Sequence, residues 1–283
     1  MPSLRFGYGT NGFTHHRLPD VLAILADLGY DGVALTLDHV HLDPYADDLP
    51  RRVAEVARHL DQHGLTVTVE TGAPYLLDGW AKHEPTLMSD DAPRRIDLLT
   101  RAVRIAAELG SPTVHLCSGR LPAGMSESDG LRRLADGVMT VLETARPLGI
   151  ALAVEPEPYM FVDTVDRCLE LRRRVGDDMF GITLDVGHAH CVEEAPVLAC
   201  VRAAAPCLRN VQIEDMCRGV HKHLEFGAGE IDFPPVLAAL VDLGHTGLVS
   251  VEIQGGALDA PDIARRSIDF LRAVSPLTES STL

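Results

Sequence analysis

The stretch IALAVE at residues 150–155 is an apolar run that ends in a single carboxylate, Glu155. Three later stretches follow the same pattern and also end in a polar side chain: FGITLD (180–185), LRNVQ (208–212) and LVSVE (248–252). Roughly 30 to 40 residues separate successive stretches, and the segments between them carry helical patterns. Apolar strands that alternate with helices are typical of parallel sheets with both faces covered. These four stretches therefore predict a parallel α/β fold.

The same alternation extends along the rest of the chain. Further strands are predicted at 4–9, 31–37, 65–70 and 112–117, and the last two opening stretches extend to 208–215 and 248–254. Helices are predicted at 18–28, 50–64, 94–109, 130–149, 164–174, 193–204, 234–243 and 261–274. Eight strands alternating with eight helices predict a closed (β/α)8 TIM barrel, a single domain over residues 1–283. An open doubly wound sheet is the alternative, but no G-x-G-x-x-G motif follows a strand to support its dinucleotide-binding version.

Two segments fall outside this alternation. Residues 71–93 contain proline, glycine, aspartate and the only tryptophan, Trp80, and are expected to form a long loop at the rim of the barrel. The segment 275–283, SPLTESSTL, is expected to be a frayed tail.

Composition limits the cell compartment and the partners. No apolar run approaches the roughly 20 residues of a membrane span, and the N-terminus does not resemble a secretory signal. The six cysteines form no C-x-x-C pair and are spread along the chain, which is typical of reduced thiols. We therefore expect a cytoplasmic protein with no membrane partner.

The charge of the chain argues against nucleic acid as a partner. The formal net charge is −16, and no dense basic run is present. Nucleic-acid binding draws most of its affinity from neutralised phosphates and needs a basic face. A small phosphate-bearing substrate is left open, because a few arginines at a rim suffice to bind it.

Polar side chains gather at the predicted carboxyl ends of the strands. These ends lie on one rim of a parallel barrel, where the reactive groups of such barrels are found. Glu155, Asp185, Gln212 and Glu252 would meet there, although the chain places them far apart. Three carboxylates in one place repel each other unless a cation lies between them. The sequence therefore predicts a divalent metal site, with Mg²⁺ or Mn²⁺ favoured by oxygen ligands and Mn²⁺, Co²⁺ or Zn²⁺ favoured if imidazole joins them.

Other polar or aromatic residues at this rim are candidates for binding a substrate or a metal. His188 follows Asp185 by three residues, and His221 and His223 alternate in a predicted loop after the seventh strand. The ring of His115 faces into or out of the barrel depending on the strand register. The remaining candidates for substrate contacts are Glu70, Arg218 and Trp80. A lone carboxylate at a strand end is more often solvated or a helix cap, and Trp80 has loop packing as its alternative.

Several motifs together resemble the xylose-isomerase-like barrels. This superfamily includes sugar-phosphate isomerases and epimerases, ketohexose 3-epimerases, inosose dehydratases and the endonuclease IV group. The resemblance covers residues 4 to 274, and its motifs are fairly specific for the superfamily and weak for the substrate. They are AVEPE (153–157), TLDVGH (183–188), VQIED (211–215), HKHLEFGAGEIDF (221–233) and SVE (250–252).

The resemblance implies roles for individual residues. Glu155, Asp185 and Glu252 match metal-binding acids, and the two glutamates match residues that also move protons in the epimerases. Gln212 departs from the histidine that many members have at this position, which puts the usual metal in question. His188 matches a residue near the substrate. His221 and His223 resemble the place where the endonuclease members hold a further zinc, and His115 matches another of their zinc ligands.

The leading hypothesis is a metal-dependent isomerase or epimerase of a small sugar, sugar phosphate or cyclitol, acting by proton transfer through an enediolate. Glu155 and Glu252 would be the acid–base pair, and His188 and Arg218 would hold substrate oxygens. The alternatives are a metal-dependent hydrolase or lyase on the same rim, and a barrel without catalytic activity. The sequence leaves open the substrate, the metal and the oligomeric state, including a homo-oligomer.

Overall fold

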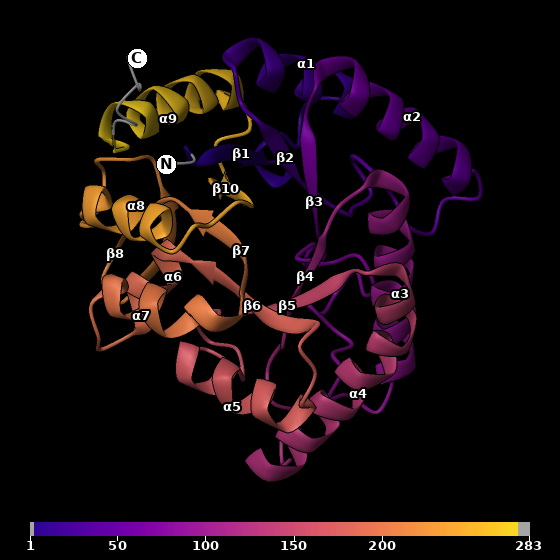
Figure 1. Ribbon diagram of the computed structural model, residues 1–283. Helices are drawn as coiled ribbons and strands as arrows, with labels where there is room; N and C mark the ends of the chain where they lie inside the picture. Colours follow the sequence, from indigo (N-terminus) through magenta and orange to yellow (C-terminus); the bar gives the residue numbers. More distant parts are fainter. Residues whose placement is uncertain (1–2, 277–283) are drawn as a thin grey trace.

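Eight parallel strands close into a barrel in the computed structural model, which describes residues 3–276 (Figure 1). Hydrogen bonding runs in the order β1-β10-β7-β6-β5-β4-β3-β2, and β2 pairs back to β1. The predicted TIM barrel is therefore confirmed, and the open sheet is excluded. The barrel strands are β1 (Arg5–Gly9), β2 (Gly32–Thr36), β3 (Thr66–Glu70), β4 (Thr113–Cys117), β5 (Ala151–Glu155), β6 (Phe180–Asp185), β7 (Leu208–Ile213) and β10 (Leu248–Val251).

Helices form a ring outside the strands (Figure 1). Among the described residues these are α1 (Leu18–Leu28), α2 (Leu49–His63), α3 (Ala92–Leu109), α4 (Glu127–Leu148), α5 (Val165–Val175), α6 (Val186–Val192), α7 (Val197–Ala204), α8 (Phe233–Asp242) and α9 (Ala260–Val274). Two short 3-10 turns, η1 (Thr10–Gly12) and η2 (Ala205–Cys207), complete the set. The apolar side of each long helix packs on the strands, so strand residues are buried on both faces and read as continuous apolar runs.

Two elements differ from the sequence prediction. The helix predicted at 193–204 is preceded by a separate short helix, α6, which begins directly after β6. Five of its seven residues are buried, so its sequence VGHAHCV lacks the one-sided apolar pattern from which helices are predicted.

The second difference is a two-stranded hairpin where a strand end and a loop were predicted. The strands β8 (Asp215–Cys217) and β9 (Val220–Leu224) pair antiparallel, with Arg218 and Gly219 as the turn. Gly219 adopts φ +74°, a left-handed conformation that glycine allows at this turn. Because β9 exposes polar residues such as Lys222, its sequence gives no apolar strand signal.

The strand register aligns the carboxyl ends of the barrel. Asp185 is the partner of Gln212, Cys117 is the partner of Glu155, and Thr36 is the partner of Glu70. The two members of each pair are level, and successive pairs are staggered along the barrel, but all of them lie at the carboxyl ends of their strands. The register therefore explains how residues distant in sequence reach one site.

Two remaining segments lie outside the helices and strands. Residues 71–91 connect β3 to α3 without a helix or strand. The segment 275–276 follows α9, and the rest of the predicted tail, 277–283, lies outside the described residues.

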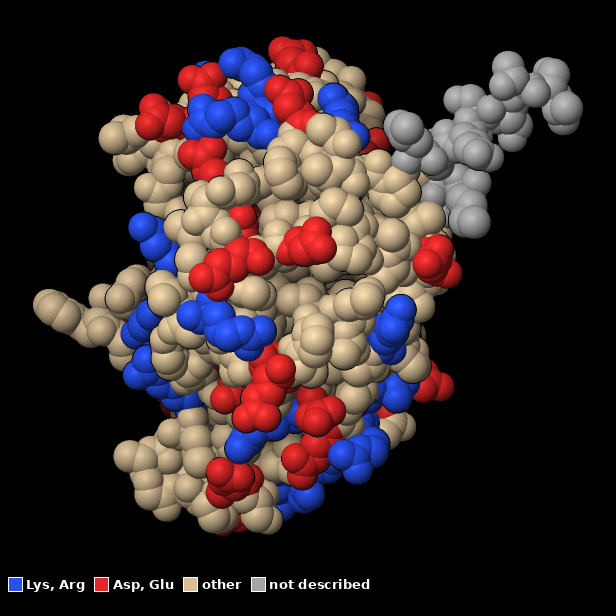
Figure 2. Space-filling view, turned by 90° about the vertical axis from the view of Figure 1, so that its left-hand side faces the viewer, with Lys and Arg blue, Asp and Glu red and all other residues tan. Residues whose placement is uncertain are grey.

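The helix composition and the surface charge bear on the expectation that the protein binds neither membranes nor nucleic acid. Within residues 3–276, every helix is too short or too polar to cross a membrane. Figure 2 shows one face of the molecule, on which acidic and basic side chains are interspersed without a continuous basic field.

Candidate metal centre and active site

The four predicted metal ligands meet at the carboxyl end of the barrel. Glu155 and Asp185 end β5 and β6, Gln212 lies near the end of β7, and Glu252 directly follows β10. All four are buried, with at most 8% of the residue surface exposed. Ligand atoms of Glu155, Asp185 and His188 lie within 4.8 Å of one another, and so do those of Asp185, His223 and Glu252.

Each of the four residues has a buried oxygen that makes no well-aligned hydrogen bond among the described residues, although Glu155 Oε1 lies 2.8 Å from His188 Nδ1 as an ion pair. These atoms are Glu155 Oε1, Asp185 Oδ2, Gln212 Oε1 and Glu252 Oε2. Buried polar atoms are almost always paired, so the oxygens of Asp185, Gln212 and Glu252 indicate that something absent from the protein chain satisfies them. Three carboxylates and an amide oxygen are a ligand set that a hard divalent cation prefers. The residues therefore fit a divalent metal ion.

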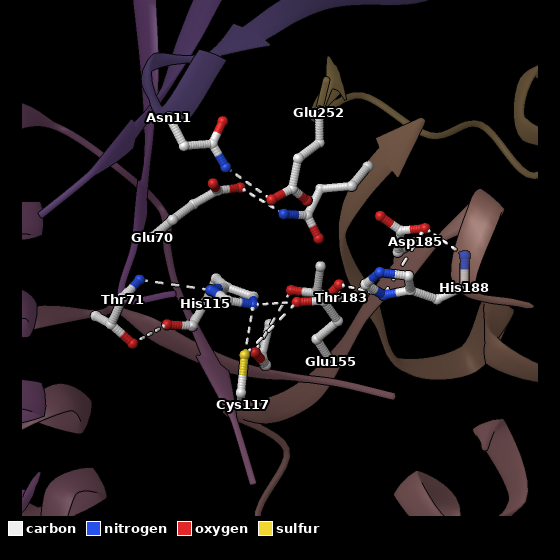
Figure 3. A network of polar contacts seen from close by, with 12 residues as sticks. Asn11, Glu70, Thr71, His115, Cys117, Glu155, Thr183, Asp185, His188 and Glu252 are labelled. Atoms are coloured by element: carbon white, nitrogen blue, oxygen red, sulfur yellow. Dashed lines mark hydrogen bonds and ion pairs between the residues drawn. The ribbon is translucent and has the colours of Figure 1, made fainter. Parts of the chain in front are cut away.

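Two histidines flank the Glu155 carboxylate (Figure 3). His115 Nε2 lies 2.5 Å from Glu155 Oε2, and His188 Nδ1 lies 2.8 Å from Glu155 Oε1. The Thr71 backbone nitrogen lies 3.4 Å from His115 Nδ1, so the other edge of the ring faces the start of the loop after β3. Burial alone would raise the pKa of Glu155, but the positive charges of His115 and His188 hold it well below its usual range. Glu155 is thus a carboxylate kept ionised by its neighbours.

The neighbouring carboxylates raise the pKa values of the two histidines. Burial alone would lower both pKa values, but Glu155 raises the pKa of His115 to about 9. Asp185 and then Glu155 raise the pKa of His188 to about 10. The inward orientation of His115, which the sequence left open, brings this imidazolium next to the predicted catalytic carboxylate.

Glu252 lies in a different environment from Glu155. Its Oε1 accepts hydrogen bonds from Asn11 Nδ2 at 2.7 Å and from Gln254 Nε2 at 2.9 Å. Burial raises the pKa of Glu252, and the charge of His223 only partly offsets this effect. Figure 3 shows Glu252 and Glu155 approaching the centre of the site from different sides. The two predicted acid–base residues are therefore electrostatically unequal.

A glutamate on β3 fixes the amide of Gln212. Gln212 Nε2 donates to Glu70 Oε1 at 3.1 Å, which leaves the carbonyl oxygen of Gln212 as the free end. Burial and then Glu252 raise the pKa of Glu70 to about 8. Glu70 thus orients the one amide among the four candidate ligands.

Three histidines form a second group beside the carboxylates. The ring centroids of His188 and His221 are 4.6 Å apart, those of His188 and His223 are 5.2 Å apart, and a 2.9 Å contact joins Nε2 of His188 to Nε2 of His221. His223 Nδ1 lies 2.9 Å from the Glu252 carbonyl oxygen. Burial and the two neighbouring imidazoles lower the pKa of His221 to about 4. The β8–β9 hairpin therefore presents His221 to the site as a neutral imidazole. The charges of Glu252 and Asp185, by contrast, outweigh burial and raise the pKa of His223.

Two predicted substrate contacts are not brought to the site. Arg218 is exposed in the hairpin turn, and its guanidinium donates to the Glu193 carbonyl oxygen at 2.6 Å. Trp80 is 98% exposed in a turn whose backbone N–H donates to Asp78 Oδ1. Neither side chain lines the cavity, because each is held on the outer side by contacts that the sequence does not reveal.

Several site residues escaped a specific prediction. Asn11 lies in the short 3-10 turn after β1, and Gln254 and Glu157 follow the ends of β10 and β5. Glu214 is fully buried beside His223, with 3.7 Å between its Oε1 and His223 Nδ1, and burial raises its pKa well above the usual range. Gly187 leaves room for this carboxyl, since a Cβ at that position would collide with it. A carboxyl group after a predicted strand can be recognised as a buried site residue only when its neighbours in space are known.

A cavity of about 500 Å³ opens at this end of the barrel. Its walls come from β-strand ends and from loops on all sides of the barrel, including Asn11, Thr36, Asp38, Lys82 and Glu157. The predicted residues Glu70, His115, Glu155, His188, Gln212, His221, His223 and Glu252 also line it. This size suits a small organic ligand rather than a polymer.

A (β/α)8 barrel with buried acids at the carboxyl ends of its strands defines a class of barrels whose active site lies at that end. Within this class, the chain belongs to the xylose isomerase-like TIM barrel family, whose family model matches residues 22–274. The superfamily resemblance found in the sequence is thereby confirmed.

Individual relatives of the chain are sugar epimerases. L-ribulose-5-phosphate 3-epimerase UlaE of Escherichia coli is 22% identical over 244 residues, which cover 85% of this chain and 83% of the relative. A solved L-ribulose 3-epimerase superposes with a TM-score of 0.77 at 22% identity, covering 96% and 94% of the two chains. The D-allulose 3-epimerase from Methylomonas sp., solved with D-allulose, gives a TM-score of 0.75 at 20% identity and covers 96% and 98%. At these identities the solved structures establish the shared fold.

Proposed function

We propose that this protein is a metal-dependent epimerase or isomerase of a small sugar or cyclitol. The observation that carries the proposal is the buried group of Glu155, Asp185, Gln212 and Glu252, in which Asp185, Gln212 and Glu252 each have an oxygen without a partner among the described residues. The relatives that are sugar epimerases support the same reaction class. When bound, a divalent cation would supply positive charge that stabilises negative charge developing on substrate oxygens.

Glu155 and Glu252 are the residues proposed to move the proton. Each is a carboxylate with one oxygen held by neighbours, at His115 for Glu155 and at Asn11 and Gln254 for Glu252. These contacts fix the direction of each side chain, which proton transfer requires within a reach of about 2.6–3.2 Å. A carboxylate offers roughly four lone-pair sites over its two oxygens, so one group can hold a cation and still accept a proton. Their unequal surroundings suit one group to remove a proton while the other returns it.

His188 is proposed to hold a substrate oxygen. Its ring lines the cavity, with Nδ1 at Glu155 and Nε2 at His221. On substrate binding, Nε2 would exchange its contact with His221 for a charge-assisted hydrogen bond to a hydroxyl or carbonyl. The cavity walls would exclude bulk water from the reacting carbon.

The histidine group favours a second candidate function, a metal-dependent hydrolase or lyase. His188, His221 and His223 place ligand nitrogens within 4.8 Å of one another, and three imidazoles suit Zn²⁺. Such a site would add a second ion next to the carboxylates. Elemental analysis separates the two candidates, since two or more zinc ions per chain favour the hydrolase or lyase and one ion favours the epimerase.

The experiment that tests the proposal follows solvent deuterium into candidate ketopentoses and ketohexoses. Protein stripped by a chelator is expected to exchange at background rate, and Mn²⁺, Mg²⁺, Co²⁺ or Zn²⁺ is expected to restore exchange at one carbon. Exchange at the full rate in metal-free protein would contradict the proposed mechanism.

A further inference from the structure

The charged groups that line the cavity are mostly acidic. Five carboxylates face it, on Asp38, Glu70, Glu155, Glu157 and Glu252, and Asp185 lies directly beneath. Of the 25 lysines and arginines of the chain, Lys82 alone lines the cavity in the described part of the structure. The ligand therefore meets a surface dominated by hydrogen-bond acceptors.

The arginines near the rim are engaged elsewhere. Arg95 donates to the carbonyl oxygens of His83 and Pro85, so it supports the loop after β3 from outside the cavity. Arg218 donates to the Glu193 carbonyl oxygen on the outer side of the hairpin. Phosphate esters are most often bound by guanidinium groups or by several free N–H donors, and neither arginine offers its donors to the cavity.

The loops that most often bind phosphate in such barrels follow the seventh and eighth strands. Here both loops lead to helices whose N-termini already carry acids. Asp232 precedes α8, and Asp259 precedes α9 with Asp262 in its first turn. The carboxylates of Asp232 and Asp259 make no capping hydrogen bond among the described residues, but a negative charge next to a helix N-terminus opposes the binding of a phosphate there.

Three of the five histidines that line the cavity in the described structure already contact acceptor groups of the protein, His223 at the Glu252 carbonyl oxygen. His115 and His188 contact Glu155. Burial and the nearby charges of Lys82 and Arg95 lower the pKa of His83 to about 4, so its ring is neutral near pH 7. Hydroxyl groups, by contrast, find many acceptors here, because each can donate to a carboxylate such as Asp38 or Glu157.

We propose that the substrate is an uncharged sugar or polyol, and that phosphate esters are excluded by the acidic cavity wall. This inference rests on the proposed epimerase or isomerase function and narrows its substrate class. A phosphate monoester carries about −1.5 to −2 charge near pH 7. A bound cation would offset the charges of Glu155 and Glu252. Among the described residues, however, the rest of the wall offers the ester one lysine, Lys82, and no guanidinium group, while Asp38 repels it. The substrate therefore differs in charge from the ribulose phosphate named for the relative in Escherichia coli.

The test compares matched pairs on metal-loaded protein: L-ribulose with L-ribulose 5-phosphate, and D-fructose with D-fructose 6-phosphate. Solvent deuterium exchange gives kcat/KM for each sugar, and calorimetry at constant ionic strength gives binding. For at least one pair, we expect the free sugar to exceed its ester at least tenfold in kcat/KM or affinity. An ester that binds or reacts better than its free sugar would overturn the inference, and so would failure of all four compounds to bind.

Two variants make the test specific for charge. Asp38→Asn removes one wall carboxylate while keeping the oxygen that accepts from the backbone of Val40 and His41, and should raise the ester-to-sugar ratio severalfold. Lys82→Met removes the lysine of the cavity wall and should change kcat/KM for the free sugar and for its ester by similar factors. A tenfold loss for the ester on Lys82→Met, together with a preference for esters, would identify a phosphate site instead. Free sugars that bind without exchanging deuterium would contradict the proposed reaction but support the substrate class.

Discussion

The two ends of the barrel strands are built by different rules. At the amino ends, helices α1, α2, α3, α4 and α5 each stop at a glycine with positive φ, and the next strand begins within a few residues. The left-handed glycine lets its N–H bond back to the helix, so the backbone groups at these turns are paired. At the carboxyl ends, carboxylates, imidazoles and an amide are buried together, and several of their atoms lack partners.

This difference assigns stability mainly to the amino ends of the strands and function to their carboxyl ends. Turns at the amino ends satisfy their own hydrogen bonds and keep polar side chains out of the core. The carboxyl ends concentrate like charges at a cost in folding free energy, which is tolerated where a bound ion or substrate compensates it. Substitutions at the two ends should therefore affect different properties.

The largest expected effect is on the proposed acid–base pair. Glu155→Gln and Glu252→Gln, made separately, should each lower the rate of solvent deuterium exchange by about 100-fold or more, because the amide cannot accept the proton. Circular dichroism should show the fold unchanged. Glu143→Gln, an exposed glutamate on the outside of α4, is the matched control and should keep the full rate. Equal activity of all three variants would show that neither Glu155 nor Glu252 transfers the proton.

A smaller effect is expected at the amide ligand. Gln212→Ala removes the oxygen that Glu70 orients toward the site, so affinity for Mn²⁺ should fall roughly 10- to 100-fold by calorimetry. Gln62→Ala, on the exposed side of α2, should leave the affinity unchanged. Unaltered Mn²⁺ binding in Gln212→Ala would exclude Gln212 from the metal centre.

Two glycine substitutions compare the ends most directly. At the amino end, Gly149→Ala introduces a Cβ into free space but at φ +70°, and should lower the free energy of unfolding by about 1–2 kcal/mol without changing kcat/KM. At the carboxyl end, Gly187→Ala would push its Cβ against Glu214 beside the metal ligands, so kcat/KM should fall about tenfold or more. Urea unfolding and exchange rates measure both. A loss of activity only in Gly149→Ala would reverse the comparison.

Much of the fold and the chemistry of the rim could be predicted from the sequence. Apolar runs such as FGITLD locate the strands, and a closed parallel barrel brings Asp185 and Glu252 to one end whatever the loops do. The proposed metal ligands follow from residue type and position at strand ends alone.

The remainder depends on contacts between distant residues. The direction of Arg218 is set by a hairpin turn whose strand partner is polar, and the direction of Trp80 is set by a turn on Asp78. The roles of Asn11 and Glu70 emerge only when Glu252 and Gln212 are placed beside them. Local sequence patterns carry no information about such pairings, so side-chain direction in rim loops escaped prediction.

The central claim is that a divalent ion binds among Glu155, Asp185, Gln212 and Glu252. Anomalous diffraction from crystals of Mn²⁺-loaded protein, collected near the manganese edge, tests it most directly. We predict a single strong peak within about 2.0–2.4 Å of oxygen atoms from these four side chains. A peak only among His188, His221 and His223, or no peak at the carboxyl ends of the strands, would contradict the claim.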